Sequence, residues 1–356
     1  MKSLPINNGN VFISDSLKSD LPKFLKPFCN DKIFLLTDEN TFRYCYPEIS
    51  DIKEIDNKKI IVIKAGDNNK NIETLTQIWQ FLTEHKADRY SLLINLGGGV
   101  VCDVGGFAAA TFKRGLSFIN IPTSLLAQVD ASIGGKIGIN FLNYKNEIGL
   151  FKQADTVIIN GDLLKHLDKE NILSGFAEII KHSLLKDEKT FNNVVKFDLT
   201  NINYILLNHL VTESIIIKDF FVSADPNEKN IRKALNFGHT IGHAFETFAS
   251  LKQKPIPHGY AVAYGMVCEL YLSHLLFGFC IEKVQILTDY VSSNYGKLNF
   301  SKSDFDPLIE IMLHDKKNRN GQISFSLLKQ IGEVFVDVFC DKLLINKVLE
   351  FYFRNK

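Results

Sequence analysis

The residues best suited to chemistry in this sequence are two histidines, in the segment Gly238-His239-Thr-Ile-Gly-His243. In a helix this spacing puts both imidazoles on one face, one turn apart, where they can hold a metal ion. His258 stands just before another predicted helix, and Glu178 lies in an earlier one. A lone histidine is usually structural, but two at this spacing, flanked by glycines, favour a site. A catalytic zinc typically takes three protein groups, and the sequence alone does not decide which of these four residues they are.

Further polar residues surround the histidines. Arg232 and Asn236 precede His239 and His243 at spacings of four, three and four, which predicts a polar stripe along one helix. Lys181 follows Glu178 by three residues, so both lie on one helix face. Such a pair is usually exposed. Taken together, however, the polar stripe, this pair and the two histidines favour a functional site.

A glycine-rich turn in the first half, Gly97–Phe107, follows a predicted strand and opens a predicted helix. Glycines let the backbone approach a phosphate closely, and the amides of a helix N-terminus stabilise the anion. The turn is not the standard G-x-G-x-x-G fingerprint, so it indicates phosphate binding only moderately. We predict a second small-residue loop at Val129–Lys136, with Lys145 and Asn146 shortly after it, as further groups for phosphate and hydroxyl oxygens.

The elements that must position these residues differ between the two halves. The first half alternates short apolar strands with helical stretches, which is typical of a parallel, doubly wound, Rossmann-like sheet. The predicted strands are 32–37, 59–64, 90–95, 117–121 and 156–159, and a helix is predicted at 72–86. Since 356 residues exceed the usual size of one core, we expect an α/β nucleotide-binding domain at 1–165.

Helical periodicity dominates from about Leu163 onward. The predicted helices are 171–186, 203–222, 232–250, 259–277 and 282–295. We therefore expect residues 166–356 to form an all-α metal- and substrate-binding domain.

Composition excludes several classes of protein. The chain has 41 basic and 40 acidic residues and a net charge of +1, which argues against a surface built mainly for nucleic acid or anionic lipid. No signal-peptide pattern or uninterrupted apolar run of membrane-spanning length is present. The six cysteines are scattered, without a C-x-x-C pair, and are expected to be reduced thiols of a cytoplasmic protein.

The ordered motifs, taken together, strongly resemble the 3-dehydroquinate synthase family, from about Thr37-Asp38 to Gly332. The matching segments are Gly97–Asp103, Pro122–Ser124, Val129–Lys136, Lys145-Asn146, Ala177-Glu178, Lys181, Leu235–His243, His258-Gly259 and Asp315–Lys317. The resemblance implies a nucleotide-binding α/β domain, a metal-binding helical domain and a homodimer.

The resemblance also implies roles for individual residues. Glu178, His239 and His258 would bind one divalent metal, zinc or cobalt. NAD would contact Asp38, Asp67, Lys70, Gly98, Gly99, Val100, Val101, Cys102, Asp103, Thr123, Ser124, Lys136, Lys145, Leu163 and His166. Substrate and catalysis would involve Arg114, Asp130, Lys136, Asn146, Lys181, Lys218, Arg232, Asn236 and His243, with one of Lys316 and Lys317. In relatives the residue at Arg114 reaches the active site of the partner subunit.

The reaction that the resemblance implies needs both groups. The substrate is a small sugar acid phosphate, 3-deoxy-D-arabino-heptulosonate 7-phosphate. NAD would oxidise C5 transiently while the metal polarises neighbouring oxygens. Phosphate elimination, re-reduction, ring opening and an intramolecular aldol step would then give 3-dehydroquinate. The resemblance thus implies a carbon–oxygen lyase of the shikimate pathway, which leads to chorismate and the aromatic amino acids.

Some positions depart from the family pattern: Asp67, Ile137, Asn143-Tyr144, His166 and Tyr260. None of them removes a predicted metal ligand or charged catalytic group. The alternatives are another sugar phosphate cyclase, a metal-dependent alcohol or glycerol dehydrogenase, and a non-catalytic binding protein that keeps the fold. The set of charged residues beside a predicted metal site argues against the last of these.

Overall fold

The computed structural model describes residues 1–7, 9–142, 144–313 and 322–354. The chain forms two compact units. The first contains Met1–Asp168 and Val211–Phe220, and the second contains Lys169–Leu210 and the described residues from Phe221 onward. Each unit has its own buried hydrophobic core.

A seven-stranded sheet organises the first unit, with the order β1-β2-β9-β6-β5-β3-β4. Only β1 runs antiparallel to its neighbour, and all other pairings are parallel. The strands are β1 (Lys2–Ser3), β2 (Val11–Ile13), β3 (Ile33–Asp38), β4 (Ile60–Ile63), β5 (Leu92–Gly97), β6 (Ser117–Pro122) and β9 (Thr156–Ile159). The five predicted strands are all present, within one or two residues.

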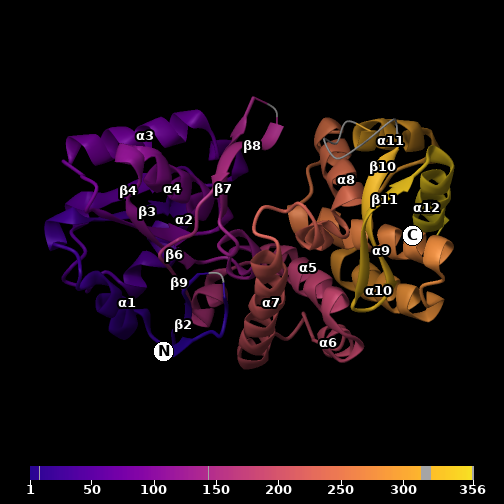
Figure 1. Ribbon diagram of the computed structural model, residues 1–356, viewed down its shortest axis with the longest axis horizontal. Coiled ribbons are helices and arrows are strands. Elements are labelled where there is room, and N and C mark those ends of the chain that lie inside the picture. Colours follow the sequence, from indigo (N-terminus) through magenta and orange to yellow (C-terminus); the bar gives the residue numbers. More distant parts are fainter. Residues whose placement is uncertain (8, 143, 314–321, 355–356) are drawn as a thin grey trace. The chain divides into compact units, whose positions relative to one another are not determined.

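Helices cover both faces of this sheet, as Figure 1 shows. On one face, α3 (Ile72–Glu84) and α4 (Gly99–Thr111) pack against Phe34, Leu36 and Leu93. On the other, α1 (Leu17–Leu25) and the segment after α2 (Glu39–Tyr44) pack against Leu35 and Ile94. Neighbours along a strand therefore point to opposite cores, which explains why the strands are apolar throughout. The predicted doubly wound sheet is confirmed.

The predicted second small-residue loop, Val129–Lys136, is a loop only at Ser132–Gly135. Ala127–Ala131 forms a five-residue π-helical turn that contains Asp130. Lys136 then begins β7 (Lys136–Phe141), which pairs antiparallel with β8 (Tyr144–Phe151), and Lys145 and Asn146 lie on β8. The glycines on the two strands face one another: a Cβ on Gly138 would lie 2.5 Å from the Ile148 carbonyl oxygen. Ile137, Ile139 and Phe141 stand at every second position of β7, and this strand signal of period two was not recognised in the sequence.

The second unit is mainly helical, as predicted. Its helices are α5 (Lys169–Lys186), α6 (Glu188–Val194), α7 (Tyr204–Ala224), α8 (His239–Leu251), α9 (His258–Phe277), α10 (Ile281–Tyr295), α11 (Phe305–Leu313) and α12 (Lys342–Arg354), with Val211–Phe220 of α7 belonging to the first unit. Helices α9 and α10 begin one residue before their predicted starts, and α5 begins two residues before.

The prediction of one helix over 232–250 is wrong. Residues Ile231–Asn236 form a 3₁₀ turn, and α8 starts only at His239. Gly238 between them has φ +80°, which an L side chain rarely adopts, so the helix cannot run through it. Buried Glu269 accepts hydrogen bonds from Gly238 N at 2.6 Å and Ile241 N at 3.0 Å and so caps α8. Arg232 and Asn236 therefore do not share a helical stripe with the histidines.

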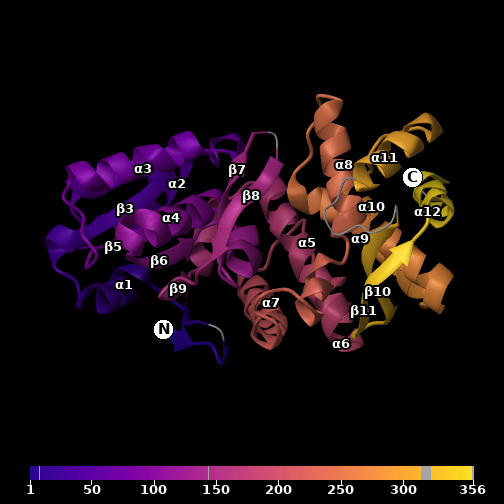
Figure 2. The ribbon, with the colours of Figure 1, turned by 45° about the horizontal axis from the view of Figure 1, so that its top comes forward.

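The second unit also contains a β-hairpin, so the all-α prediction for residues 166–356 is incomplete. Strands β10 (Ile323–Gln330) and β11 (Glu333–Cys340) pair antiparallel, and β10 packs against α9 (Figure 2). The first six residues of β10 are buried, whereas β11 alternates in exposure. The β-branched and aromatic run Val334–Phe339 was a strand signal that the helical prediction passed over.

Helix α9 forms the centre of this unit. It is long and apolar enough to cross a membrane by length and composition, but 67% of its most apolar window is buried inside the fold. Glu269 and Ser273 on this helix are fully buried and hydrogen-bonded. These features are those of a core helix.

All six cysteines are free thiols, and burial raises the pKa of Cys45 and Cys340 to about 12.

Candidate metal and nucleotide sites

Small residues bring three helices of the second unit into close contact. A Cβ on Gly259 of α9 would lie 1.9 Å from the Ser174 carbonyl oxygen of α5. Where α8 crosses α9, a Cβ on Gly265 would lie 2.0 Å from the Gly238 carbonyl oxygen. Any side chain at these glycines would separate the backbones. The glycines therefore place His258, at the start of α9, beside α5 and α8.

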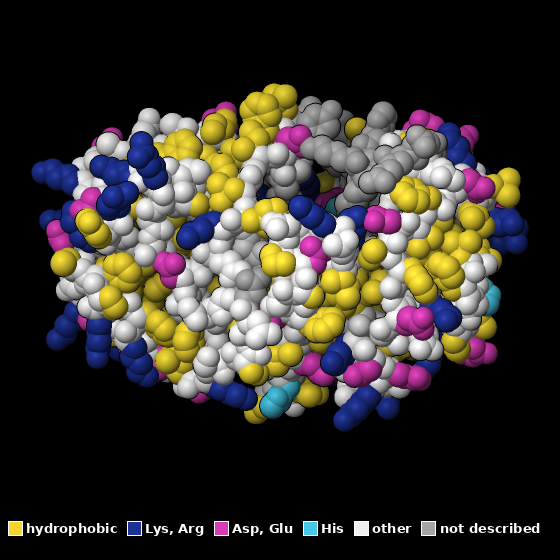
Figure 3. Space-filling view, in the orientation of Figure 1, with side chains coloured by type: hydrophobic (Ala, Val, Ile, Leu, Met, Phe, Trp, Pro, Cys, Tyr) yellow, Lys and Arg dark blue, Asp and Glu magenta, His cyan; other side chains and the backbone are white. Residues whose placement is uncertain are grey.

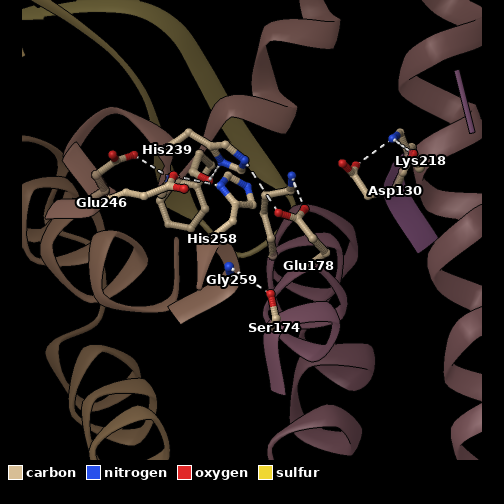
Figure 4. A network of polar contacts seen from close by, with 12 residues as sticks. Asp130, Ser174, Glu178, Lys218, His239, Glu246, His258 and Gly259 are labelled. Carbon is tan, nitrogen blue, oxygen red and sulfur yellow. Dashed lines mark hydrogen bonds and ion pairs between the residues drawn. The ribbon is translucent and has the colours of Figure 1, made fainter. Parts of the chain in front are cut away.

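Four predicted site residues come together at this contact (Figure 4). One ring nitrogen of each of His239, His243 and His258 lies within 4.8 Å of the others. The ring centroids of His239 and His258 are 5.4 Å apart. Glu178 joins the group through α5, with its Oε1 3.5 Å from His239 Nε2. The sequence motif thus predicted a cluster that the fold assembles from three separate helices.

The carboxylate of Glu178 has the surroundings of a metal ligand. It is fully buried, and within the described residues neither oxygen accepts a hydrogen bond. Its charged neighbour is Lys181, which is 2% exposed and forms an ion pair with Oε2. Lys181 and Glu178 are thus a buried pair rather than an exposed one. Burying this carboxylate is costly, and a divalent cation bound by Glu178 and the imidazoles would compensate this cost. The residues present fit such an ion.

The protonation of His239 suits a ligand as well. Burial, together with the positive charge of Lys181, lowers the pKa of His239 well below its ordinary value. A neutral imidazole keeps one nitrogen lone pair for a metal. His239 Nδ1 faces the Phe237 carbonyl oxygen at 3.2 Å, which leaves Nε2 on the side of Glu178.

Three acidic residues around this site were not predicted from the sequence. Glu246 lies 3.1 Å from Nδ1 of His258, Glu228 accepts a hydrogen bond from Asn236 at 2.8 Å, and Glu269 caps α8. Glu246 follows His239 by seven residues, two helical turns, so periodicity alone could have placed it on the same face. Glu228 and Glu269 lie outside α8, and no sequence spacing links them to their partners.

Arg232 is fixed by the loop before it. Asp225 accepts hydrogen bonds from the backbone N–H groups of Lys229, Asn230 and Arg232, and Arg232 Nη1 donates to the Pro226 carbonyl oxygen at 2.6 Å. The side chain is 2% exposed. Its buried position was not predicted from the sequence.

In the first unit, the predicted NAD positions follow the carboxyl ends of parallel strands. Asp38 ends β3, Asp67 and Lys70 follow β4, Gly98 and Gly99 follow β5, Thr123 and Ser124 follow β6, and Leu163 and His166 follow β9. Strand β4 follows β3 in the chain and lies beside it, toward one edge of the sheet. Strand β5 lies on the other side of β3, and the next strand, β6, lies beside β5 toward the opposite edge. Ligands of open α/β sheets bind at such a switch point.

A polar network lies at this edge of the sheet. Lys70, which is 6% exposed, donates to Asp103 Oδ2 at 2.5 Å and also to Asn146 Oδ1. Asn140 joins the network through a bond from Asn146 N at 2.9 Å, and Lys145 Nζ lies 3.3 Å from Asp67. Burial raises the pKa of Asp103, against the opposing charge of Lys70. The network assembles four predicted NAD residues and one predicted substrate residue, and Asn140 was not predicted.

The other predicted residues differ in their surroundings. Asp130 pairs with Lys218 of α7 at 2.6 Å, a contact that was not predicted from the sequence. Asp38 accepts hydrogen bonds from Asn40 N and Thr41 N and caps α2. The side chain of Leu163 belongs to the core, whereas Arg114, Lys136 and His166 are exposed. The remaining predicted NAD residues Val100, Val101, Cys102 and Asp103 lie in the first turns of α4. Lys316 and Lys317 lie outside the described residues.

Comparison with known families identifies two adjoining matches. Residues 60–174 match the family described as 3-dehydroquinate synthase N-terminal, and residues 175–318 match that described as 3-dehydroquinate synthase C-terminal. A curated 3-dehydroquinate synthase from Parabacteroides distasonis is 50% identical over 347 residues, which is 98% of either chain.

Solved structures with the same fold are more distant in sequence. A 2-deoxy-scyllo-inosose synthase complexed with carbaglucose-6-phosphate, NAD⁺ and Co²⁺ has a TM-score of 0.84 at 20% identity and covers 98% of either chain. A 2-epi-5-epi-valiolone synthase from Streptomyces hygroscopicus, with NAD⁺ and Zn²⁺ bound, has a TM-score of 0.83 at 21% identity. The alignment with the latter spans 100% of this chain and 99% of the other. At these identities the likeness shows the fold.

Proposed function

This chain belongs to the 3-dehydroquinate synthase family, and we propose that it converts 3-deoxy-D-arabino-heptulosonate 7-phosphate to 3-dehydroquinate and phosphate. The observation that carries the proposal is the meeting of buried Glu178 with the imidazoles of His239, His243 and His258. No specific observation favours another sugar phosphate cyclase or a metal-dependent dehydrogenase.

The metal site that we propose consists of Glu178, His239 and His258. It takes one divalent zinc or cobalt ion, which when bound supplies a Lewis acid to polarise oxygens of the substrate. Two helices of the second unit present the histidines, and the cap that Glu269 forms holds the start of α8 in place. His243 then faces the site as a group that can hold or transfer a proton.

We propose that NAD binds at the switch point of the first unit, in the domain we assign to residues 1–165. When bound, NAD would accept a hydride from the substrate and would later return it. Gly98 and Gly99 open α4, whose first amides can bind a phosphate group. A Cβ on Gly98 would lie 3.4 Å from Ser124 Oγ, so a larger residue at this position would take up space between the turn and Ser124. Lys70 forms an ion pair with Asp103, so the Asp103 carboxylate can accept a hydrogen bond from a hydroxyl group and the Lys70 ammonium can donate one.

The charged residues that we assign to the substrate are Lys136, Lys181, Lys218, Arg232 and Asn236, with Arg114, Asp130, Asn146 and His243. Lysine and arginine can bind phosphate and carboxylate oxygens through charge-assisted hydrogen bonds. The decisive assay incubates the purified protein with NAD, zinc or cobalt and the heptulosonate phosphate, and follows both phosphate release and the carbocyclic product. Phosphate release without 3-dehydroquinate would reject the proposed reaction.

We expect NAD to be needed only in catalytic amount. The proposed reaction oxidises and then re-reduces the same carbon, so no net redox change occurs. A trace of NAD should sustain many turnovers, and NADH absorbance should show at most a transient. NADH that accumulates in step with product would instead identify a dehydrogenase.

The substitutions Lys136→Ala and Arg232→Ala should separate cofactor binding from substrate binding. Lys136 is assigned to both ligands, whereas Arg232 belongs to the second unit and is assigned to substrate alone. A charge-assisted bond stabilises by roughly 1.5–3 kcal/mol, so each variant should bind a phosphonate analogue of the substrate roughly ten- to a hundredfold more weakly. Only Lys136→Ala should also weaken NAD binding. Calorimetric titrations with each ligand test this, and analogue binding unchanged in Arg232→Ala would contradict the assignment.

The protein is further proposed to be a cytoplasmic homodimer without nucleic acid or membrane partners. Hydrophobic side chains gather at the β7–β8 hairpin, as Figure 3 shows, and Phe141, Leu142, Ile148 and Phe151 are between 39% and 81% exposed. Exposed apolar clusters often mark an interface. Light scattering during size-exclusion chromatography measures the mass, and a monomer at all concentrations would reject the dimer.

A further inference from the structure

We propose that Glu246 is a positioning residue that fixes the ring of His258 for the metal. This inference rests on the proposed metal site and adds a residue that the family motifs left without a role. Glu246 lies on α8 and His258 at the start of α9, and Figure 4 shows the carboxylate directed at the imidazole. The distance from Glu246 Oε2 to His258 Nδ1 is 3.1 Å, within hydrogen-bonding range.

The placement of Glu246 follows from the geometry of α8. His239, His243 and Glu246 are four and three residues apart, so they lie on one helix face over two turns. Two members of this row belong to the imidazole cluster, and the third contacts His258 from the adjoining helix. Only 12% of the Glu246 side chain and 30% of the His258 side chain are exposed. Water therefore competes weakly for this hydrogen bond.

The bond decides which nitrogen of His258 carries the proton. A carboxylate accepts from Nδ1–H, so Nε2 keeps its lone pair free for a metal. His239 is arranged in the same way, because its Nδ1 faces the Phe237 carbonyl oxygen at 3.2 Å while Nε2 lies on the side of Glu178. Two histidines are thus oriented by two different acceptors, one a carboxylate and one a backbone carbonyl. Without Glu246, the ring of His258 could rotate or take the other tautomer.

The first test measures zinc affinity of the metal-free protein by competition with a chromophoric chelator. Loss of an outer-shell partner typically weakens metal binding by roughly 10- to 100-fold. We expect this loss in Glu246→Ala and a smaller one in Glu246→Gln, because the amide oxygen can still accept from Nδ1–H. Glu188→Gln is the matched control, since this carboxylate is 62% exposed and pairs with Lys283 on the surface. The control should bind zinc as the parent does.

The second test is nitrogen NMR of the histidine rings in the metal-free protein, which reports tautomers without any turnover. His258 should be protonated at Nδ1 in the parent and in Glu246→Gln, and should shift toward the Nε2–H form in Glu246→Ala. If the parent binds zinc and Glu246→Ala binds it equally well with the same tautomer, the role of Glu246 is rejected. A parent that binds no zinc rejects the metal site itself. Should Glu246→Ala fail to fold, the glutamine variant decides: an affinity equal to the parent's, with His258 protonated at Nε2, overturns the proposal.

Discussion

The variant His239→Ala should lose its bound divalent metal and with it the release of phosphate from the substrate. His239 contacts Glu178 at 3.5 Å and shares the cluster with His243 and His258, so its removal leaves an incomplete set of ligands. Outer-shell changes alone cost up to roughly 100-fold in metal affinity, and the loss of a direct ligand should exceed that. Elemental analysis and zinc titration measure the metal, and the coupled assay measures turnover.

Two comparisons make this result interpretable. A chelator should abolish activity of the parent, and zinc or cobalt should restore it, whereas neither ion should restore His239→Ala. The matched control is His209→Ala, since this exposed histidine of α7 is absent from the cluster. Full metal content in purified His239→Ala would falsify the assignment of this ligand.

The variant Gly259→Ala should weaken both the fold and the metal site, although the change adds only one methyl group. Its Cβ would lie 1.9 Å from the Ser174 carbonyl oxygen and 2.5 Å from the Ser174 Cα. Both are backbone atoms and cannot rotate away, so α9 must move from α5. Overpacking of this kind typically costs about 1–3 kcal/mol, and the displacement would carry His258 away from Glu178. Denaturant unfolding and zinc titration measure the two effects.

The control for this variant lies at the same contact. Ser174→Ala removes the hydroxyl that accepts a hydrogen bond from Gly259 N at 3.2 Å, but it introduces no collision. A typical hydrogen bond contributes about 1 kcal/mol, so this variant should unfold slightly earlier and still bind zinc. Equal stability and zinc affinity in Gly259→Ala and the parent would show that α5 and α9 do not depend on this close approach.

Much of the fold could be predicted from the sequence, because period and glycine placement are local signals. Short apolar runs such as Ile33–Leu36 indicate strands buried on both faces, and the glycines after Asn95 mark the turn from strand to helix. The pair His239 and His243 indicated a metal site through its spacing alone. Local patterns failed to show where α8 begins. The helical period continues from Arg232 through Gly238, although the backbone at Gly238 is left-handed and the helix starts only after it.

The sequence by itself therefore indicated most of the elements, although not the hairpins β7–β8 and β10–β11, and it indicated which residues are suited to chemistry, but not which of them meet. Glu178 and His258 are 80 positions apart, and only the contacts of α5, α8 and α9 at Gly259 and Gly265 bring them together. The same holds for Lys70 with Asp103 and Asn146, and for Glu269 beneath Gly238. Burial and partners depend on packing between distant segments, which no local period encodes. Only the tertiary structure could decide that Lys181 is a buried partner of Glu178 and that Glu246 faces His258.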